Sequence, residues 1–337
     1  MSSPRATAAF AGLLALLLVC SGCATGTVAD QSAGSAPRRP GATASAAGAT
    51  AYTPYASATT AAGTDTAGSP DTYNLAFVVA DGDACTPVWG GSAAATDPAV
   101  VARVAALTSS GADVRVSFGG AAGTEPALAC DSARELADAY GQVLDAVGAT
   151  RADFDIEGDA LTDTASVTRR NEALHLLQQE RDVDITYTLP VMPDGLEADG
   201  TAVLDDAVAQ GVDVSAVNIM AMNYSSSHDG DMGDYARQAA EAAHGQIADL
   251  LGLSEKKAWR ALHITVMIGV NDVAGETFTL ADAASLRSFA RSVGVGALSQ
   301  WAAFRDRPCT GGNTSKASDT CSGVEQTAGA FAKALSG

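Results

Sequence analysis

The sequence predicts an α/β protein whose folded part is a single-domain (β/α)8 TIM barrel. Strand-like apolar runs alternate with helix-like amphipathic segments, the pattern of a parallel sheet covered by helices. Residues 50–337 amount to about 288 residues, within the usual range for this barrel. An open doubly wound sheet is the alternative, but it normally carries a glycine-rich phosphate-binding turn after its first strand. The turn at residues 81–85, Asp-Gly-Asp-Ala-Cys, is not of that kind, which favours the barrel.

The elements follow from hydrophobic periodicity. Strands are predicted at residues 75–80, 114–118, 152–156, 183–189, 212–222, 262–268 and 295–301, with a weaker one before them at 52–59. Helices are predicted at residues 98–107, 131–147 (capped by Asp131), 165–180, 202–210, 235–251, 280–293 and 323–335. No helix can be recognised between residues 60 and 72, where the barrel pattern is weakest.

The N-terminal residues are typical of a targeting segment. Arg5 precedes an apolar stretch over residues 6–19, whose length suits a secretory signal better than a membrane-spanning helix. The small residues before Cys23 resemble the lipobox of bacterial lipoproteins, in which this cysteine is lipidated, although Cys20 stands where Leu is usual. We therefore expect a lipoprotein-type signal peptide over residues 1–23 and a cell-surface protein. An ordinary signal peptide with free secretion is the alternative.

Residues 24–49 are almost entirely Ala, Ser, Gly, Thr and Pro, which predicts a flexible linker.

Composition limits the class of partner. The net charge of −19, from 39 acidic and 20 basic side chains, disfavours binding to nucleic acid or anionic lipid. No apolar run after the N-terminus is long enough to span a membrane, so membrane contact is expected only through the lipid anchor. We expect a monomer without nucleotide, flavin or metal cofactor.

Four cysteines remain in the predicted barrel, and they allow three disulfide pairings. Export favours disulfides, and we predict Cys85–Cys130 and Cys309–Cys321, the second closing a short glycine-rich loop. A zinc site is the alternative. It is disfavoured because these cysteines form no Cys-x-x-Cys pair and the four histidines are scattered along the chain.

Three carboxylates mark the predicted fourth strand, counting the weak strand as the first. Asp153, Asp155 and Glu157 share one strand face, while Phe154 and Ile156 share the other. In a barrel the carboxylates would line the interior, with Glu157 at the catalytic C-terminal rim. Their mutual repulsion is tolerable if a proton is shared, which raises at least one pKa and suits a general acid. An acidic metal site and a solvated edge strand are the alternatives.

Several motifs resemble one known family. Asp153-x-Asp155-x-Glu157 resembles the end of the Asp-x-x-Asp-x-Asp-x-Glu signature of the family 18 glycoside hydrolases, the chitinases. Ser117-Phe-Gly119-Gly120 matches their Ser-x-Gly-Gly element on the third strand. Residues 217–224, Val-Asn-Ile-Met-Ala-Met-Asn-Tyr, resemble their sixth-strand motif, and residues 298–309 resemble the eighth strand and its loop. Residues 75–91 and 267–272 are similar to actinobacterial members, so the resemblance extends from about Leu75 to the C-terminus.

The resemblance implies a chitinase-like enzyme that cleaves β-1,4-linked N-acetylglucosamine polymers or oligosaccharides. In that family, hydrolysis is assisted by the substrate and retains the anomeric configuration. By analogy, Glu157 protonates the glycosidic oxygen, Asp155 orients the acetamido group, and Asp153 shares the proton that lets Asp155 switch partners. Trp301 would form the hydrophobic floor under the sugar being cleaved. The candidate substrate-binding residues are Trp301, Tyr224, Asn223, Met222, Ser117, Gly119, Gly120, Trp89 and Asp272.

The sequence also departs from the family pattern. Thr150 replaces the first Asp of the signature, and Asn223 replaces the Asp of the sixth-strand motif. Met222 stands where many members have a Tyr that binds the acetamido carbonyl, a role that Tyr224 could take over. We expect an active enzyme, because the three carboxylates nearest the chemistry are present. The alternatives are a non-hydrolytic protein that binds the same sugars and an endo-β-N-acetylglucosaminidase that cuts N-glycans.

Overall fold

The computed structural model describes residues 49–337. The predicted signal peptide, Cys23 and nearly all of the predicted linker lie outside the described residues. Seven neighbouring strands form a parallel row in the order β13, β10, β9, β8, β7, β6, β3. Their bounds are β3 (Thr72–Asp81), β6 (Asp113–Gly119), β7 (Arg151–Asp155), β8 (Asp184–Pro190), β9 (Val214–Met220), β10 (Leu262–Met267) and β13 (Ala297–Trp301).

The first barrel strand is divided into two short pieces, β1 (Ala51–Tyr52) and β2 (Tyr55–Ser57). β1 pairs with β13 and β2 pairs with β3, both in parallel, so this segment contacts both ends of the row. Pro54 lies between the two pieces and has no N–H to donate, which explains why no single strand spans residues 52–59.

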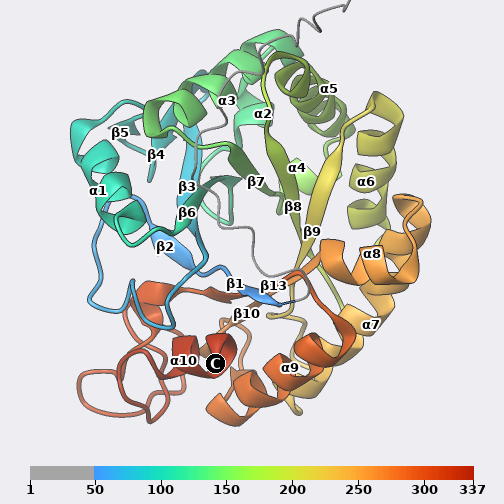
Figure 1. Ribbon diagram of the computed structural model, residues 1–337. Helices are drawn as coiled ribbons and strands as arrows, with labels where there is room; N and C mark the ends of the chain where they lie inside the picture. The colour runs from blue at the N-terminus through green and yellow to red at the C-terminus, as the bar shows by residue number, and fades with distance from the viewer. Residues whose placement is uncertain (1–48) are drawn as a thin grey trace, which may run out of the picture. The chain divides into compact units, whose positions relative to one another are not determined.

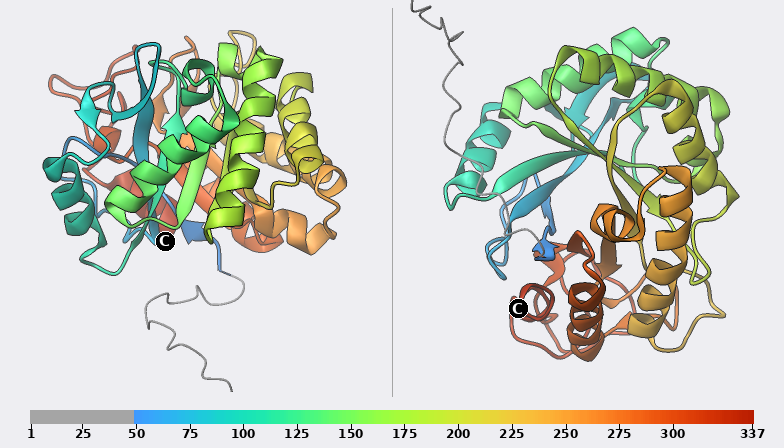
Figure 2. Two further views of the ribbon diagram at one scale, coloured as in Figure 1. Left: turned by 90° about the horizontal axis from the view of Figure 1, so that it is seen from above. Right: turned by 45° about the vertical axis from the view of Figure 1, so that its right-hand side comes forward.

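Helices surround the strands, as Figures 1 and 2 show. The longer ones are α1 (Pro98–Thr108), α3 (Ala133–Val147), α5 (Thr164–Glu180), α6 (Ala198–Gln210), α7 (Met232–Leu250) and α9 (Leu280–Val293). Shorter ones are α2 (Pro126–Ala129), α4 (Asp159–Thr162), α8 (Glu255–Ala261), the 3-10 helix η1 (Ala303–Arg305) and α10 (Ala330–Ser336). This alternation of parallel strands and covering helices confirms the predicted fold class. Of the helices that the structure describes, none combines the length and apolar character that a membrane crossing requires.

Residues 60–71 contain turns and no helix, in agreement with the sequence, in which no helix could be recognised there. Some boundaries differ from the sequence prediction. The helix predicted over 323–335 begins only at Ala330, after Gly329, which adopts a left-handed conformation (φ 78°). The carboxylate of Asp306 caps this helix by accepting the N–H groups of Phe331 and Ala332. The hydroxyl of Ser132, not Asp131, caps α3. Two antiparallel additions were not predicted: the extension β4 (Ala84–Trp89) and β5 (Ala93–Ala94), and the pair β11 (Gly269–Val270) and β12 (Thr277–Phe278).

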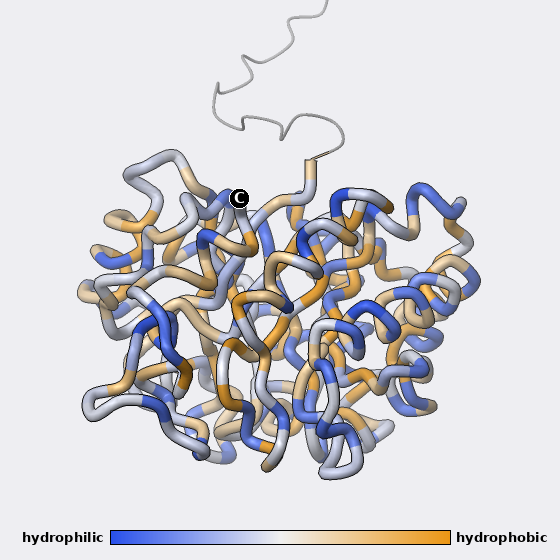
Figure 3. Tube along the Cα trace, turned by 90° about the horizontal axis from the view of Figure 1, so that it is seen from below, coloured by the Kyte–Doolittle hydropathy of each residue, from blue (hydrophilic) through white to orange (hydrophobic). Residues whose placement is uncertain are grey.

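The core lies between the strands and the helices, and Figure 3 shows hydrophobic positions concentrated there and hydrophilic positions on the outer loops. Phe154 and Ile156 of the carboxylate-bearing segment are fully buried, as the alternation predicts. Phe154 stacks on Phe118 with ring centroids 5.3 Å apart and meets Tyr140 edge-on at 5.0 Å. This apolar face fixes the rotation of β7 and turns its carboxylates toward the barrel interior.

Both predicted disulfides are present. Cys85–Cys130 ties β4 to the end of α2 across 45 residues. Cys309–Cys321 closes a loop after η1 across 12 residues. The zinc alternative for these four cysteines is therefore wrong.

Candidate active site

The three carboxylates follow one face of β7 from the barrel interior to its rim. Asp153 and Asp155 are buried, with exposed fractions of 1% and 4%. Glu157 lies two residues beyond the end of the strand and is partly exposed. The side chains therefore pass from a dry interior to a position that a substrate can reach, and the burial of the inner two has to be compensated.

Asp153 is held by three hydroxyl groups. Its Oδ2 accepts hydrogen bonds from the hydroxyls of Tyr55 (2.9 Å) and Ser117 (2.5 Å), and its Oδ1 accepts one from Thr188 (2.6 Å). Burial raises the pKa of Asp153, whereas these hydroxyls and the Arg115 guanidinium oppose the rise. Hydrogen bonds to a carboxylate favour its charged form, so this network fixes Asp153 in one orientation.

Asp155 and Glu157 form the site's titrating pair. Burial raises the pKa of Asp155 well above its ordinary value, and the charges of Glu157 and then Asp153 add to the rise. Burial also raises the pKa of Glu157, while hydrogen bonding to Asp155 lowers it. Oδ1 of Asp155 is buried and has no hydrogen-bond partner among residues 49–337. A shared proton between the two groups removes most of their repulsion, which is the state a general acid requires.

The glycines at the end of β6 support β7 through its backbone. Gly119 has φ 97°, and a Cβ there would lie only 2.2 Å from the Asp155 carbonyl oxygen. The N–H of Gly120 donates to that oxygen at 2.9 Å, and a Cβ on Gly120 would lie 2.8 Å from the Phe77 ring. Any side chain at these positions would displace Asp155 or Phe77.

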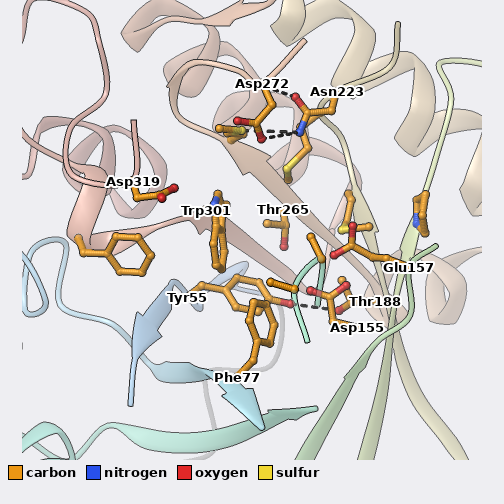
Figure 4. Close-up of a pocket in the computed structure, with 17 residues that line it drawn as sticks. Tyr55, Phe77, Asp155, Glu157, Thr188, Asn223, Thr265, Asp272, Trp301 and Asp319 are labelled. Atoms are coloured by element: carbon orange, nitrogen blue, oxygen red, sulfur yellow. Dashed lines mark hydrogen bonds between the residues drawn. The ribbon is translucent and has the colours of Figure 1, made fainter. Parts of the chain in front are cut away.

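A cavity of about 520 Å³ opens beside Asp155 and Glu157 (Figure 4). Aromatic rings form one side of it: Trp301 stacks on Phe77 with centroids 5.4 Å apart, and Tyr55 meets Trp301 edge-on at 5.8 Å. Aromatic faces of this kind complement the apolar face of a sugar ring. The lining residues are Tyr55, Phe77, Ala121, Ala122, Asp155, Glu157, Thr188, Pro190, Met220, Met222, Asn223, Thr265, Met267, Asp272, Trp301, Phe304 and Asp319.

Comparisons with known proteins agree with this geometry. No model of a protein family matches the chain. The chain is 36% identical over 251 residues to a probable bifunctional chitinase/lysozyme of Escherichia coli, a match that covers 70% of this chain and 28% of that protein. It is 35% identical over 250 residues to endochitinase 11 of Metarhizium anisopliae, covering 70% of this chain and 48% of that one. The chain thus spans less than half the length of these curated relatives.

Solved structures are also similar. The catalytic domain of a hyperthermophilic chitinase from Pyrococcus furiosus superposes with a TM-score of 0.74 and 28% identity, over 84% of this chain and 93% of that one. A GH18 chitinase from Pseudoalteromonas aurantia shares the fold, with a TM-score of 0.53 and 16% identity over 75% of this chain and 94% of that one. The chain is thus similar to chitinases in sequence and to a chitinase catalytic domain in fold.

Met222, Asn223 and Asp272 lie at the cavity wall, as predicted for substrate-binding residues. Asn223 has φ 56°, a conformation that Asn tolerates better than most residues. Its Oδ1 accepts the N–H groups of Asp272 (3.0 Å) and Val273 (3.3 Å), and its Nδ2 donates to the Asp272 carboxylate (3.3 Å). A carboxylate at position 223 could not donate to Asp272. The exchange of Asp for Asn therefore has a structural explanation, because the amide ties β9 to the loop after β11.

Two predicted substrate-binding residues do not line the cavity. Trp89 is fully buried in the core and its indole N–H donates to the Ala95 carbonyl (3.4 Å), so the expectation of sugar stacking is wrong. Tyr224 is only 7% exposed, packs against His228 and Tyr235, and does not line the cavity, so it cannot replace the missing tyrosine.

Three further predicted substrate-binding residues lie behind the cavity wall. Ser117 is fully buried on Asp153, and Gly119 and Gly120 contact the backbone of β7 and the ring of Phe77. Thr150 precedes β7 and is exposed, away from the carboxylates. Asp153 itself is supported by hydroxyls on β2, β6 and β8.

The sequence interpretation missed several cavity residues. Tyr55 lay in the weakest predicted strand, and its polar contact with Asp153 spans 98 residues. Phe77 lies in an apolar run of the sequence, in which residues that line the cavity cannot be told from residues of the core. The other missed residues are Ala121, Ala122, Thr188, Pro190, Met220, Thr265, Met267, Phe304 and Asp319.

Proposed function

We propose that this protein is a chitinase-like hydrolase of β-1,4-linked N-acetylglucosamine chains, with Glu157 as the general acid and base. The observation that supports this most strongly is the pairing of two carboxyl groups with raised pKa values, Asp155 and Glu157, in one cavity with the aromatic ring of Trp301. The 35–36% identity to chitinases supports the substrate class.

The proposed reaction has two steps. Glu157 gives its proton to the glycosidic oxygen while the acetamido carbonyl oxygen of the substrate bonds to the anomeric carbon and the C–O bond to the leaving sugar breaks. Asp155 accepts the acetamido N–H and stabilises the cyclic intermediate, and Asp153 stays fixed by its three hydroxyl donors. The Glu157 carboxylate then takes a proton from water, whose oxygen bonds to the anomeric carbon from the original side as the bond between that carbon and the acetamido oxygen breaks. Two inversions retain the configuration.

We also propose that the protein is exported as a monomer and anchored by a lipid on Cys23. The charged and then apolar N-terminal segment and the small residues before Cys23 support this location. The two disulfides suit an oxidising compartment. Labelling with radioactive palmitate in a bacterial host should mark the wild type and not Cys23→Ser. Equal labelling of the two proteins would contradict the anchor.

The enzymatic proposal is tested with Glu157→Gln. This nearly isosteric amide cannot transfer the proton, so turnover of chitohexaose should fall by at least about a thousandfold. Calorimetry should show that the variant still binds the oligosaccharide. Binding by the wild type without cleavage would instead indicate a non-hydrolytic receptor. If the wild type neither binds nor cleaves chitohexaose but releases N-glycans from a glycoprotein, the protein is the endo-β-N-acetylglucosaminidase.

A further inference from the structure

A buried arginine lies in the barrel interior below the row of carboxylates. Arg115 and Ser117 share one face of β6, because side chains alternate along a strand. The Ser117 hydroxyl donates to Asp153, its neighbour on β7, so this face is directed into the barrel. Arg115 therefore lies one layer below Asp153, nearer the amino ends of the strands, and its side chain is only 7% exposed.

The Arg115 guanidinium has no carboxylate partner. Its Nη1 donates to Oδ1 of Asn74, its neighbour on β3 (2.8 Å), and its Nε has no hydrogen-bond partner among residues 49–337. Asn74 is fixed in turn, because its Nδ2 donates to the Thr53 carbonyl (2.9 Å). None of the ion pairs in the described part of the chain includes Arg115. A buried charge is costly, so a nearby opposite charge has to offset it.

The carboxylates nearer the amino ends of the strands do not offset Arg115. Arg151 forms ion pairs with both of them, Asp113 (3.1 Å) and Asp184 (3.6 Å). The side chains of Asp113 and Asp184 are 46% and 60% exposed, so water also screens their charges. The buried carboxylate next to Arg115 is Asp153. Burial lowers the pKa of Arg115, and the charge of Asp153 opposes this fall more than any other group does.

Arg115 supplies the positive charge beside Asp153. The other polar groups that surround this pair in residues 49–337 are Tyr55 on β2, Asn74 on β3, Ser117 on β6, Arg151 and Asp155 on β7, Thr188 on β8, Asn218 on β9 and His263 on β10. Burial lowers the pKa of His263 to about 3, and the charges of nearby arginines, Arg115 first, add to the effect, so this imidazole is neutral at pH 7. The guanidinium keeps its charge at neutral pH. Burial raises the pKa of Asp153, and Arg115 is among the groups that oppose the rise.

We propose that Arg115 is a positioning residue for the reaction, whose buried guanidinium keeps Asp153 ionised so that the proton needed for catalysis stays nearer the cavity. That proton is then shared by Asp155 and Glu157. The inference rests on the proposed function, because it assigns Arg115 a part in supplying the acid. An ionised Asp153 accepts from all three of its hydroxyl partners at once, whereas a protonated one has to donate in one of these hydrogen bonds. Arg115 thus acts through Asp153, without contact with the substrate.

The test is the pH dependence of kcat/KM for chitotetraose in the wild type and in Arg115→Met, whose side chain has a similar length and no charge. Loss of a positive charge raises the pKa of nearby carboxyl groups, so both limbs of the profile should move to higher pH by about 0.5–1 unit. Arg115→Lys keeps the charge and should keep the wild-type limbs. Arg134→Met removes an exposed arginine charge on α3 and is the matched control, which should show no shift. Wild-type limbs in Arg115→Met, or an equal shift in Arg115→Lys, would overturn the proposal.

Asn74→Asp tests the same charge with the arginine in place. The new carboxylate lies against Nη1 of Arg115 and pairs with it, so the limbs should move in the same direction as in Arg115→Met. This variant decides the question if Arg115→Met fails to fold. Limbs that stay at the wild-type pH, or move to lower pH, would show that the charge of Arg115 does not reach the carboxylates.

The titration of Asp153 separates this proposal from the proposed function. Carbon-13 NMR of protein labelled at the aspartate carboxyl carbons follows the Asp153 signal against pH, and Asp153→Asn identifies that signal. The wild-type carboxyl should be ionised at pH 7, and in Arg115→Met its pKa should rise by about 1–2 units. If the wild type does not cleave chitotetraose, the proposed function is wrong, and this titration still decides the role of Arg115. A wild-type Asp153 that is protonated at pH 7, or an equal pKa in Arg115→Met, would overturn it.

Discussion

Replacing Asp155 with asparagine (Asp155→Asn) should stabilise the protein while stopping its turnover, because the burial that suits Asp155 to catalysis also opposes folding. The folded-state pKa of Asp155 is raised, chiefly by burial and then by the charges of Glu157 and Asp153. The Asp155 carboxylate therefore binds a proton more tightly in the folded protein than in the unfolded chain. Stability falls as the pH rises from the unfolded pKa near 3.8 through the higher folded pKa.

The size of the effect follows from the Asp155 environment. The side chain is 4% exposed, and its Oδ1 has no partner among residues 49–337. A buried polar group left without partners costs about 1–3 kcal/mol. The amide has nearly the same shape, carries no charge and can donate to Glu157. At pH 8 the free energy of unfolding of Asp155→Asn should exceed that of the wild type by about 1–3 kcal/mol. This corresponds to a rise in Tm of roughly 2–10 °C for a domain of this size.

Calorimetric melting of the wild type and Asp155→Asn at pH 4 and pH 8 measures this directly. The difference in Tm should be small at pH 4, where the wild-type carboxyl is protonated, and should reach its full size at pH 8. Asp182→Asn changes an exposed aspartate on the same domain and should shift Tm by no more than about 1–2 °C at either pH. A lower Tm for Asp155→Asn at pH 8, or an equal gain at both pH values, would refute the reasoning.

Two further substitutions test neighbouring parts of the site. Tyr55→Phe removes one of the three hydroxyls on Asp153, so it should cost about 1.5–3 kcal/mol in urea unfolding and lower kcat. Unchanged stability and kcat would show that this hydroxyl does not hold the carboxylate. Tyr224→Phe removes a buried hydroxyl that has no partner among the described residues and lies outside the cavity. It should leave kcat/KM within twofold of the wild type, and a tenfold loss would restore Tyr224 as a substrate contact.

The sequence predicted the parts of the fold that depend on local periodicity. The alternation along residues 153–157 placed the three carboxylates on one face and Phe154 and Ile156 on the other, and the structure confirms this arrangement. The barrel itself follows from the same alternation repeated along the chain. The first strand was weak because it is two short pieces that pair with opposite ends of the sheet.

The parts that could not be predicted depend on contacts between distant segments. Asn223 is understandable only once the loop at Asp272, 49 residues away, is seen to bind both ends of its amide. Trp89 was predicted to bind substrate because the short strands β4 and β5, which place it in the core, have no distinctive periodicity. Asp319 reaches the cavity because the Cys309–Cys321 loop folds back beside Phe304.

The anomeric configuration of the first product tests the central claim most directly. The protein is incubated with chitotetraose in an NMR tube, and the anomeric protons of the product are recorded before mutarotation equilibrates them. If Glu157 acts through the acetamido group of the substrate, the new reducing end appears first as the β-anomer. An α-anomer at the earliest times, or continued cleavage by Glu157→Gln at the wild-type rate, would contradict the account.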